Sequence, residues 1–177
     1  MSNEQTTDRR QMASIGAFIK EGVTAWKGFG LLVLVPFLLS ACSGERPANL
    51  GVHSGRLSPC PASPNCVSTH STEDAEHFIQ PLMFSASPAD VMKRVRQAVQ
   101  GIDRAEIISE GDTYLHAEFT SRVLRFVDDV EFYFENKTGT LHVRSASRLG
   151  HSDLGVNRER VEEIFTRLKG TDKKPKT

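Results

Sequence analysis

The sequence predicts an α+β domain in which two helices pack on one face of an antiparallel sheet of about five strands, in the order β-α-β-β-β-β-α. Two segments carry apolar residues at helical spacing, one in the middle of the chain and one near its end. Between them lie strand-like segments joined in pairs by connections of two and four residues. Connections this short join antiparallel neighbours.

Residues 1–41 are typical of a cleaved signal peptide, because basic residues precede the apolar run Gly28–Leu39 and small residues follow it. The run has 12 residues, whereas a transmembrane helix needs about 20. We expect translation to begin at Met12, which would leave a signal of more ordinary length.

The tetrapeptide "LSAC" resembles the lipobox of bacterial lipoproteins, with Cys42 as the lipid attachment site. In such proteins the cysteine receives a diacylglyceryl group, and a fatty acid such as palmitate usually acylates its amino group. Two or more acyl chains anchor a protein stably in a membrane. Ser43 and Gly44, in place of aspartate, favour the periplasmic face of the outer membrane. The alternative is an ordinary signal peptide that is cut after Ala41.

Composition divides the rest of the chain into three parts. Residues 42–59 are rich in Gly, Ser and Pro, which predicts a flexible tether. A single globular domain is expected at 60–168, and the charged residues 169–177 predict a disordered tail.

Cys60 and Cys66 predict a structural disulfide, because an exported chain enters an oxidising compartment. A redox pair or half of a metal site is the alternative. Redox motifs normally space their cysteines by two residues, and the sequence shows no second ligand pair at zinc spacing. No metal or other cofactor is therefore expected.

The first strand is expected at His77–Phe84, where Pro81 indicates an edge strand. A helix follows, with Ser87 as N-cap, Pro88 at its first position and Asp90 in its first turn. Its apolar face has five residues at helical spacing: Val91, Val95, Ala98, Val99 and Ile102.

Four strands come next. Ala105–Glu110 and Thr113–Thr120 are expected to form a hairpin through a type II′ turn at Gly111–Asp112. Arg125–Glu135 and Thr140–Ser147 are expected to form a second hairpin through "NKTG". The last helix is expected to begin near residue 157 and to bury the residues Val161, Ile164, Phe165 and Leu168.

The second hairpin predicts a register in which Phe132 faces Val143 and Asp128 faces Ser147, with Glu131 opposite Arg144 on the other face. Asp128 then occupies a core-facing position, where a carboxylate needs a partner. The candidate partners are Arg122, Arg125, Arg148 and Arg158.

The polar run "SASRLGHSDLGVNRER" and the strand before it contain a candidate polar site. Its residues are Asp128, Ser145, Ser147, Arg148, His151, Asp153, Asn157 and Arg158. In a first interpretation they form a structural network in which Asn157 caps the last helix. In a second, arginines, serines and the N-terminus of that helix bind a small anion, such as a lipid head group or a carboxylate.

In a third interpretation Ser147 or Ser145 forms a hydrolytic triad with His151 and Asp153. No nucleophile elbow surrounds either serine, so we favour the structural network. Asp128 and the next residue point to opposite faces of a strand, which argues against a metal site with two carboxylates. The other histidines show no ligand spacing and are expected to be surface or strand residues: His53, His70, His77, His116 and His142.

The charges balance, with 22 Lys and Arg against 22 Asp and Glu. No broad basic field is therefore available for a phosphate backbone, and no nucleic acid partner is expected.

The segments "CPASPNCVST", "FVDDVEF" and "RSASRLGHSDLGVNRERVE" resemble the domain-of-unknown-function 1499 family, found in many bacteria and in plastid-bearing eukaryotes, often with a signal or lipobox. The resemblance covers about residues 50–168 and implies no reaction, substrate or cofactor. The sequence as a whole therefore predicts a lipid-anchored envelope protein that acts as a binding or structural module rather than as an enzyme. A serine hydrolase is the alternative.

Overall fold

The structure is a computed structural model that describes residues 43–170. The predicted signal peptide, the lipid attachment site Cys42 and the residues after Gly170 lie outside the described residues. Within the described range, no helix has both the length and the apolar character needed to cross a membrane.

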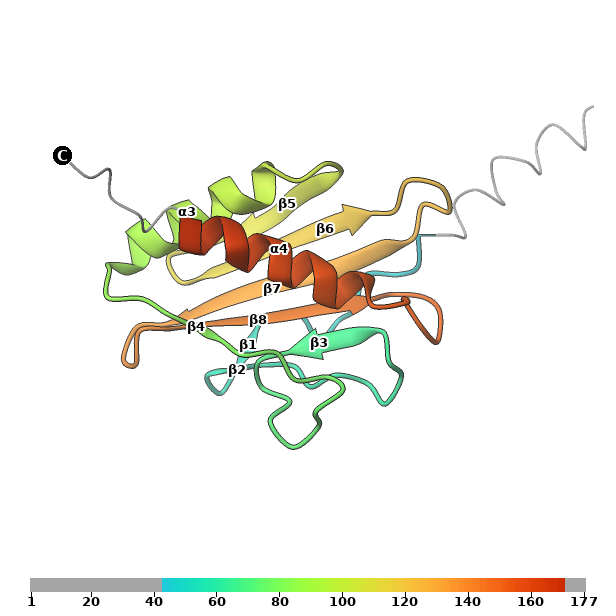
Figure 1. Ribbon diagram of the computed structural model, residues 1–177, viewed down its shortest axis with the longest axis horizontal. Coiled ribbons are helices and arrows are strands. Elements are labelled where there is room, and N and C mark those ends of the chain that lie inside the picture. Colours follow the sequence, from blue (N-terminus) through green and yellow to red (C-terminus); the bar gives the residue numbers. More distant parts are fainter. Residues whose placement is uncertain (1–42, 171–177) are drawn as a thin grey trace, which may run out of the picture. The chain divides into compact units, whose positions relative to one another are not determined.

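An antiparallel sheet of six strands forms the centre of the fold, in the order β3-β8-β7-β6-β5, with β4 also paired to β8 (Figure 1). The strands are β3 (Cys66–Ser68), β4 (Leu82–Met83), β5 (Ala105–Glu110), β6 (Tyr114–Thr120), β7 (Val127–Glu135) and β8 (Thr140–Ser147). The two short strands β3 and β4 share the outer edge of β8, where they pair with different parts of it.

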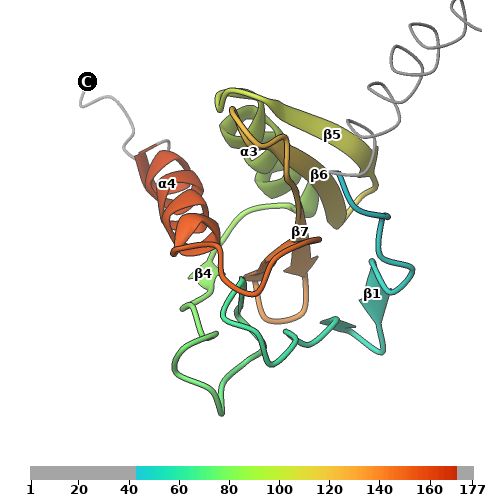
Figure 2. The ribbon, with the colours of Figure 1, turned by 90° about the vertical axis from the view of Figure 1, so that its right-hand side faces the viewer.

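The helices α3 (Pro88–Gln100) and α4 (Val156–Gly170) cover one face of this sheet (Figures 1 and 2). The α+β fold and the predicted order of its main elements are thereby confirmed. As expected, the Ser87 hydroxyl accepts a hydrogen bond from the Asp90 amide at the start of α3, at 3.2 Å. Helix α4 runs through Lys169 and Gly170, so the first two residues of the predicted tail are helical.

The core lies between the helices and the sheet, and the predicted register of the β7–β8 hairpin is confirmed. Phe132 pairs with Val143, and Phe134 pairs with Leu141. All four side chains are at most 1% exposed and belong to one apolar cluster with the inner faces of α3 and α4. The predicted disulfide between Cys60 and Cys66 is also present.

The strand expected at His77–Phe84 is largely wrong. Only Leu82–Met83 is a strand, and Phe78 forms an isolated bridge with Ser68. The reason is competition for the edge of β8: strand β3 pairs with Arg144–Ala146 of β8, which leaves the start of β8 for β4.

The predicted type II′ turn is also wrong. The Gly111 amide donates to the Tyr114 carbonyl at 2.8 Å, so Asp112 and Thr113 are the central residues of the turn. Gly111 does not have the positive φ that the first position of a type II′ turn requires. A bulge between Ile107 and Ser109 accompanies this shift of pairing.

The segment predicted to be a flexible tether packs against the face of the sheet opposite the helices (Figure 2). It contains a two-stranded ribbon of β1 (Val52–His53) and β2 (Arg56–Leu57). Leu57 is buried, and the Gly51 amide donates to the Glu131 carboxylate at 2.6 Å. Composition alone predicted a tether because it carries no information on long-range contacts. The buried Glu131 carboxylate needs hydrogen-bond donors, and the N-terminal segment supplies one of them.

Candidate functional site

The sheet divides the predicted polar site into two groups on opposite faces. Asp128 faces α4, and Asp129, the next residue of β7, faces the N-terminal segment, as the alternation of a strand requires. We call the two groups the helix-side network (Asp128, Ser145, Ser147, Asn157 and Arg160) and the sheet-face network (Arg46, His116, Glu118, Asp129 and Arg148).

The helix-side network is centred on an ion pair between Arg160 and Asp128, with Nη2 and Oδ2 2.6 Å apart. The Arg160 guanidinium also donates through Nη1 to Asn157 Oδ1 at 2.8 Å and lies 4.9 Å from the ring centroid of Phe119. This pair corrects the prediction, which placed the partner of Asp128 among four other arginines. Arg160 reaches Asp128 because it lies about one helical turn beyond Asn157, on the buried side of α4.

Asn157 connects three parts of the fold. Its side chain is fully buried, and its Nδ2 donates to the Asn65 carbonyl and to Ser147 Oγ, each at 3.0 Å. Its Oδ1 accepts from Ser145 Oγ. The amide therefore joins α4, the end of β8 and the loop that the disulfide closes, as in the structural interpretation.

Asn157 does not cap α4, contrary to the prediction. The Asp153 carboxylate accepts hydrogen bonds from the Gly155 amide at 3.0 Å and from the Asn157 amide at 2.8 Å. The chain's own carboxylate therefore takes up two amides at the N-terminus of α4, and these two are not available to an external anion.

The residues of the proposed hydrolytic triad do not come together. The hydroxyls of Ser145 and Ser147 bond to Asn157, and the Asp153 carboxylate bonds to backbone amides. His151 is exposed and makes no hydrogen bond to any of them within residues 43–170. Neither serine therefore has a general base beside it.

Arg158 lies apart from both networks. Its Nη2 donates to the carbonyls of Glu76 and Phe78 at 2.8 and 2.9 Å. It thus ties the start of α4 to the segment after β3. It also lines a pocket of about 330 Å³ with Asp153 and with Pro64 of the disulfide loop.

The sheet-face network is an ion-pair cluster around Arg148. The Arg148 guanidinium donates to both oxygens of Asp129 at 2.8 Å and to Glu118. Arg46 of the N-terminal segment donates to the same Glu118 carboxylate through Nε at 2.8 Å. His116 Nε2 lies 2.8 Å from Asp129 Oδ1.

Electrostatics keep the acids of this network ionised. Burial opposes ionisation of Asp129, but hydrogen bonds from Arg148 and His116 outweigh burial and lower the pKa of Asp129. The balance is the same for Glu118, where burial is outweighed by Arg148 and Arg46 and the pKa is lowered. The hydrogen bonds to Asp129 and Glu118 raise the pKa of Arg148. The network therefore carries full charges on a largely buried surface.

Three donors of this network, from His116, Glu118 and Asp129, lie within 4.8 Å of one another. Such a set resembles a metal site in composition. However, the Arg148 guanidinium already lies against both carboxylates, and a divalent cation would have to displace it. The geometry therefore fits an ion-pair cluster.

His116 was expected to be a surface or strand residue. It does lie in strand β6, but it is buried, with only 3% of its surface exposed, and this burial was not predicted from the sequence. A signal was available in the alternation of β6, where His116 and Glu118 lie on the same face. That face meets Asp129 and Glu131 of β7 in the cross-strand register. A period-two pattern of polar residues on paired strands predicts a buried polar layer when another segment covers it.

Glu131 lies beside this network and is completely buried. Its carboxylate accepts from the Gly51 amide at 2.6 Å, from the Tyr114 hydroxyl at 2.8 Å and from Arg144 Nη1 at 3.5 Å. Burial, and next the charge of Glu131, raise the pKa of Tyr114. Arg144 Nε is buried and has no hydrogen-bond partner within residues 43–170.

A stacked histidine pair and a histidine–aspartate pair lie near the disulfide loop. His70 stacks on His142 with ring centroids 4.2 Å apart, and burial, followed by the charge of His142, lowers the pKa of His70 to about 4. His77 is buried, with Nδ1 2.6 Å from Asp74 Oδ2 and Nε2 3.1 Å from the Ser63 carbonyl. The hydrogen bond to Asp74 raises the pKa of His77. His77 is therefore a buried link between the disulfide loop and the turn at 71–77.

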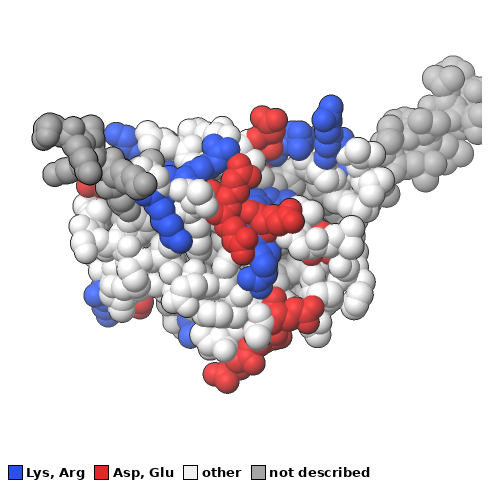
Figure 3. All heavy atoms as spheres, viewed as in Figure 1, with Lys and Arg blue, Asp and Glu red and all other residues white. Residues whose placement is uncertain are grey.

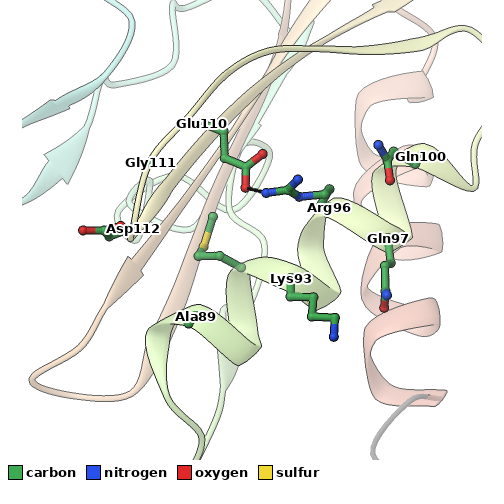
Figure 4. Close-up of a pocket in the computed structure, with 9 residues that line it drawn as sticks. Ala89, Lys93, Arg96, Gln97, Gln100, Glu110, Gly111 and Asp112 are labelled. Atoms are coloured by element: carbon green, nitrogen blue, oxygen red, sulfur yellow. Dashed lines mark hydrogen bonds and ion pairs between the residues drawn. The ribbon is translucent and has the colours of Figure 1, made fainter.

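An open pocket of about 530 Å³ lies between α3 and the β5–β6 turn (Figure 4). Arg96 and Glu110 form an ion pair across it, and Lys93 and Asp112 also line it. The face covered by the helices shows acidic and basic side chains side by side (Figure 3). That face therefore presents no field of a single sign.

Comparison with known proteins supplies a family. A family model described as "Protein of unknown function (DUF1499)" matches residues 56–168. No curated protein matches the chain. The matched range contains both cysteines of the disulfide, all of the six-stranded sheet and almost all of α4. Because the match covers more than half of the chain, the protein belongs to the DUF1499 family of proteins of unknown function, as the three sequence motifs predicted.

Proposed function

We propose that the protein is a lipoprotein of the bacterial cell envelope, anchored through acylated Cys42, whose domain acts as a binding or structural module. The observation that carries this proposal is the tetrapeptide "LSAC" directly after an apolar run of 12 residues. The disulfide between Cys60 and Cys66 supports export, because disulfides persist in oxidising compartments. Ser43 and Gly44 favour the outer membrane.

A binding or structural module is favoured over an enzyme because the candidate polar side chains bond to other parts of the fold. The hydroxyls of Ser145 and Ser147 bond to a buried amide, and Arg148 is held by Asp129 and Glu118. These side chains stabilise contacts between segments distant in the sequence, and such networks commonly serve structure.

The anchor is tested on the full chain, expressed in a bacterium that processes lipoproteins. The wild-type protein should partition with membranes, incorporate labelled palmitate and have the mass of a chain that begins at an acylated Cys42. Cys42→Ala should lose the label and the mass shift. If Cys42→Ala keeps both, the proposal is wrong.

Two matched variants separate anchoring from folding and from sorting. Cys60→Ala with Cys66→Ala removes the disulfide, and it should still be acylated. Ser43→Asp should be acylated as well, but it should be retained in the inner membrane. Acylation with no change of membrane in Ser43→Asp would contradict the outer-membrane part of the proposal.

A second candidate function is the binding of a small anion, such as a carboxylate or phosphate, by Arg158. This side chain lines the pocket of about 330 Å³ beside the disulfide loop. Only its Nη2 bonds to the protein within the described residues, so Nε and Nη1 are available to a ligand. The full chain in detergent should bind inorganic phosphate, and Arg158→Gln should not. Arg167→Gln, on the exposed side of α4, is the control. Equal binding by both variants would contradict this function.

A further inference from the structure

Exposed apolar side chains gather at one end of the domain. Seven large apolar residues are exposed within the described chain. Five of them lie on two loops and the helix residue that follows: Val123, Leu124, Leu149, Leu154 and Val156. Scattered exposed apolar residues need no explanation, but a group of them marks an interaction surface. We call this end, formed by residues 121–126 and 148–156, the apolar end.

The two loops are neighbours in space. Asp128 at the start of β7 pairs with Ser147 at the end of β8, and the Arg148 amide donates to the Val127 carbonyl at 3.1 Å. The β6–β7 loop and the β8–α4 loop therefore leave the same end of the sheet, at the right of Figure 1 and toward the viewer in Figure 2. The most exposed residues are Leu154, at 91%, and Val123, at 83%.

The described chain begins at this same end. A Cβ placed on Gly44 would lie 2.9 Å from the Cβ of Arg148 and 3.1 Å from Cγ of Leu149. Gly44 therefore packs against the first residues of the β8–α4 loop. Two Cα–Cα steps keep the Cα of Cys42 within about 8 Å of the Cα of Gly44. Acyl chains on Cys42 would consequently leave the protein beside the apolar end.

Basic residues flank the apolar residues of the β6–β7 loop, in the order Arg122, Val123, Leu124, Arg125. Both arginines are exposed, and neither forms an ion pair within residues 43–170. Arginine side chains at a membrane surface place their aliphatic part along apolar groups and their guanidinium among phosphates. The charge of this loop therefore complements an anionic phospholipid surface.

One residue in each loop has an energetically unfavourable backbone conformation. Leu154 has φ 57° and Arg125 has φ 58°, in the left-handed region that residues other than glycine seldom adopt. Strained residues of this kind cluster at functional positions. Leu154 is 91% exposed, so packing against the core of the domain does not offset the cost of this conformation.

We propose that the apolar end docks on the phospholipid bilayer that holds the acyl chains of Cys42, with Val123, Leu124 and Leu154 inserted among the lipids and Arg122 and Arg125 at the phosphates. This inference rests on the proposed lipid anchor. The anchor confines the domain near the surface, so that even weak loop insertion is effectively intramolecular. The domain then stands with the long axis of its strands pointing away from the membrane.

The test uses the acylated full chain in vesicles of phosphatidylethanolamine and phosphatidylglycerol, with part of the phospholipid brominated on its acyl chains. The sequence has one tryptophan, Trp26, which is removed with the signal peptide if the anchor forms. In the processed variants Leu154→Trp and Val123→Trp, all tryptophan fluorescence therefore comes from the one introduced side chain. Met83→Trp is the control, because Met83 is 65% exposed in β4, beside the turn at the opposite end of the sheet.

Bromine should quench the fluorescence of Leu154→Trp and Val123→Trp several-fold more strongly than that of Met83→Trp. Equal quenching at the three positions, or none at Leu154→Trp, would overturn the docking while leaving the anchor intact. A precursor that retains Trp26 and lacks acyl chains would instead show that the anchor itself is wrong. A dimer in detergent together with unquenched loop positions would assign the apolar end to a second copy and overturn the proposal.

Tryptophan itself favours membrane interfaces, so the native side chains need a separate measurement. Amide hydrogen exchange of residues 121–126 and 148–156 is compared between the anchored wild-type chain and the anchored double variant Val123→Glu with Leu154→Glu. Exchange in these loops should be several-fold faster in the double variant, with the exchange of β7 unchanged. Equal exchange in the two proteins would overturn the proposal.

Discussion

Arg160 of α4 holds Asp128 of β7 across the interface between helix and sheet, at 2.6 Å, with the two side chains 11% and 8% exposed. Removing one member of a buried ion pair leaves an uncompensated charge in a poorly solvated place. Arg160→Ala should therefore lower the free energy of unfolding by about 3 to 5 kcal/mol. Urea unfolding followed by circular dichroism measures this difference.

Arg167→Ala is the matched control, because Arg167 pairs with Glu163 on the exposed side of the same helix. Exposed pairs of this type contribute less than about 1 kcal/mol. If the two variants lose the same stability, the Arg160 pair is not the important contact between α4 and the sheet.

The contrast between β7–β8 and α4 shows which parts of this site the sequence predicts. The register of Asp128 with Ser147 was predictable, because a four-residue turn and a period of two fix every pair of a hairpin. The orientation of α4 was harder, because residues two apart on a helix, such as Arg158 and Arg160, point in nearly opposite directions.

A usable signal was nevertheless present in α4. Asn157 and Arg160 continue, at helical spacing, the stripe of Val161, Ile164 and Leu168 that the core buries. Polar residues in line with an apolar stripe indicate a buried polar contact. The sheet-face network had no comparable local signal, since Arg46 and Gly51 reach their carboxylates from a segment more than 70 residues earlier in the chain.

Asn157 provides the second prediction, because its Nδ2 donates to a backbone carbonyl of Asn65 and to Ser147. Asn157→Asp keeps the shape of the side chain but replaces the donor Nδ2 with a carboxylate oxygen. The Asn65 carbonyl then faces a second acceptor and loses its hydrogen bond. Loss of a buried hydrogen bond with an unsatisfied group left behind should cost about 2 to 3 kcal/mol. The exposed turn residue Asn136 supplies the control Asn136→Asp, whose unfolding midpoint in urea should equal that of the wild type. A neutral effect of Asn157→Asp would contradict the structural role of this amide.

The third prediction concerns reactivity. Because Asn157 binds the hydroxyls of Ser145 and Ser147 and no general base lies beside them, a fluorophosphonate should form no adduct with either serine. Mass spectrometry of the treated full chain measures this, with a serine protease as the positive reagent control. An adduct that disappears in Ser147→Ala or His151→Ala would establish the hydrolase alternative.

The fourth prediction is a loss of stability in mild acid that originates at His70. Its folded-state pKa is lowered from 6.5 to about 4, mainly by burial, so the fold favours the neutral ring. The stability from this group is complete above pH 6.5 and is lost as the pH falls toward about 4. Protonation would also remove the acceptor of the Leu57 amide, which lies 3.3 Å from His70 Nδ1.

His77 acts in the opposite sense, because its pKa is raised by the hydrogen bond to Asp74. Its contribution is complete below its unfolded pKa of 6.5 and is lost only as the pH rises through the folded value. Unfolding free energies between pH 6.5 and about 5 therefore separate His70 from His77. Burial also lowers the pKa of His142, which acts in the same sense as His70, so the slope that remains in His70→Gln reports His142. The wild type should lose more stability over this range than His70→Gln does. Identical slopes would contradict the assignment.

The fifth prediction uses Arg148, which lies against the carboxylates of Glu118 and Asp129. Arg148→Ala leaves both carboxylates without their main partner and should lower the free energy of unfolding by about 3 to 5 kcal/mol. It also removes the guanidinium that lies against both carboxylates, while Arg46 still bonds to Glu118 and the ligand atoms of His116, Glu118 and Asp129 lie within 4.8 Å of one another. Carboxylates and imidazole are zinc ligands, so the variant should be stabilised by added zinc, by about 2.7 kcal/mol at a hundredfold excess over the dissociation constant.

The wild-type protein, in contrast, should not respond to zinc. Its guanidinium already satisfies the carboxylates, so neither zinc nor a chelator should change its unfolding midpoint. Arg148→Ala combined with His116→Ala lacks one donor and should lose the zinc effect while remaining as unstable as the single variant or more so. Stabilisation of the wild type by zinc would mean that the metal displaces Arg148, and the sheet-face network would then have to be regarded as a metal site.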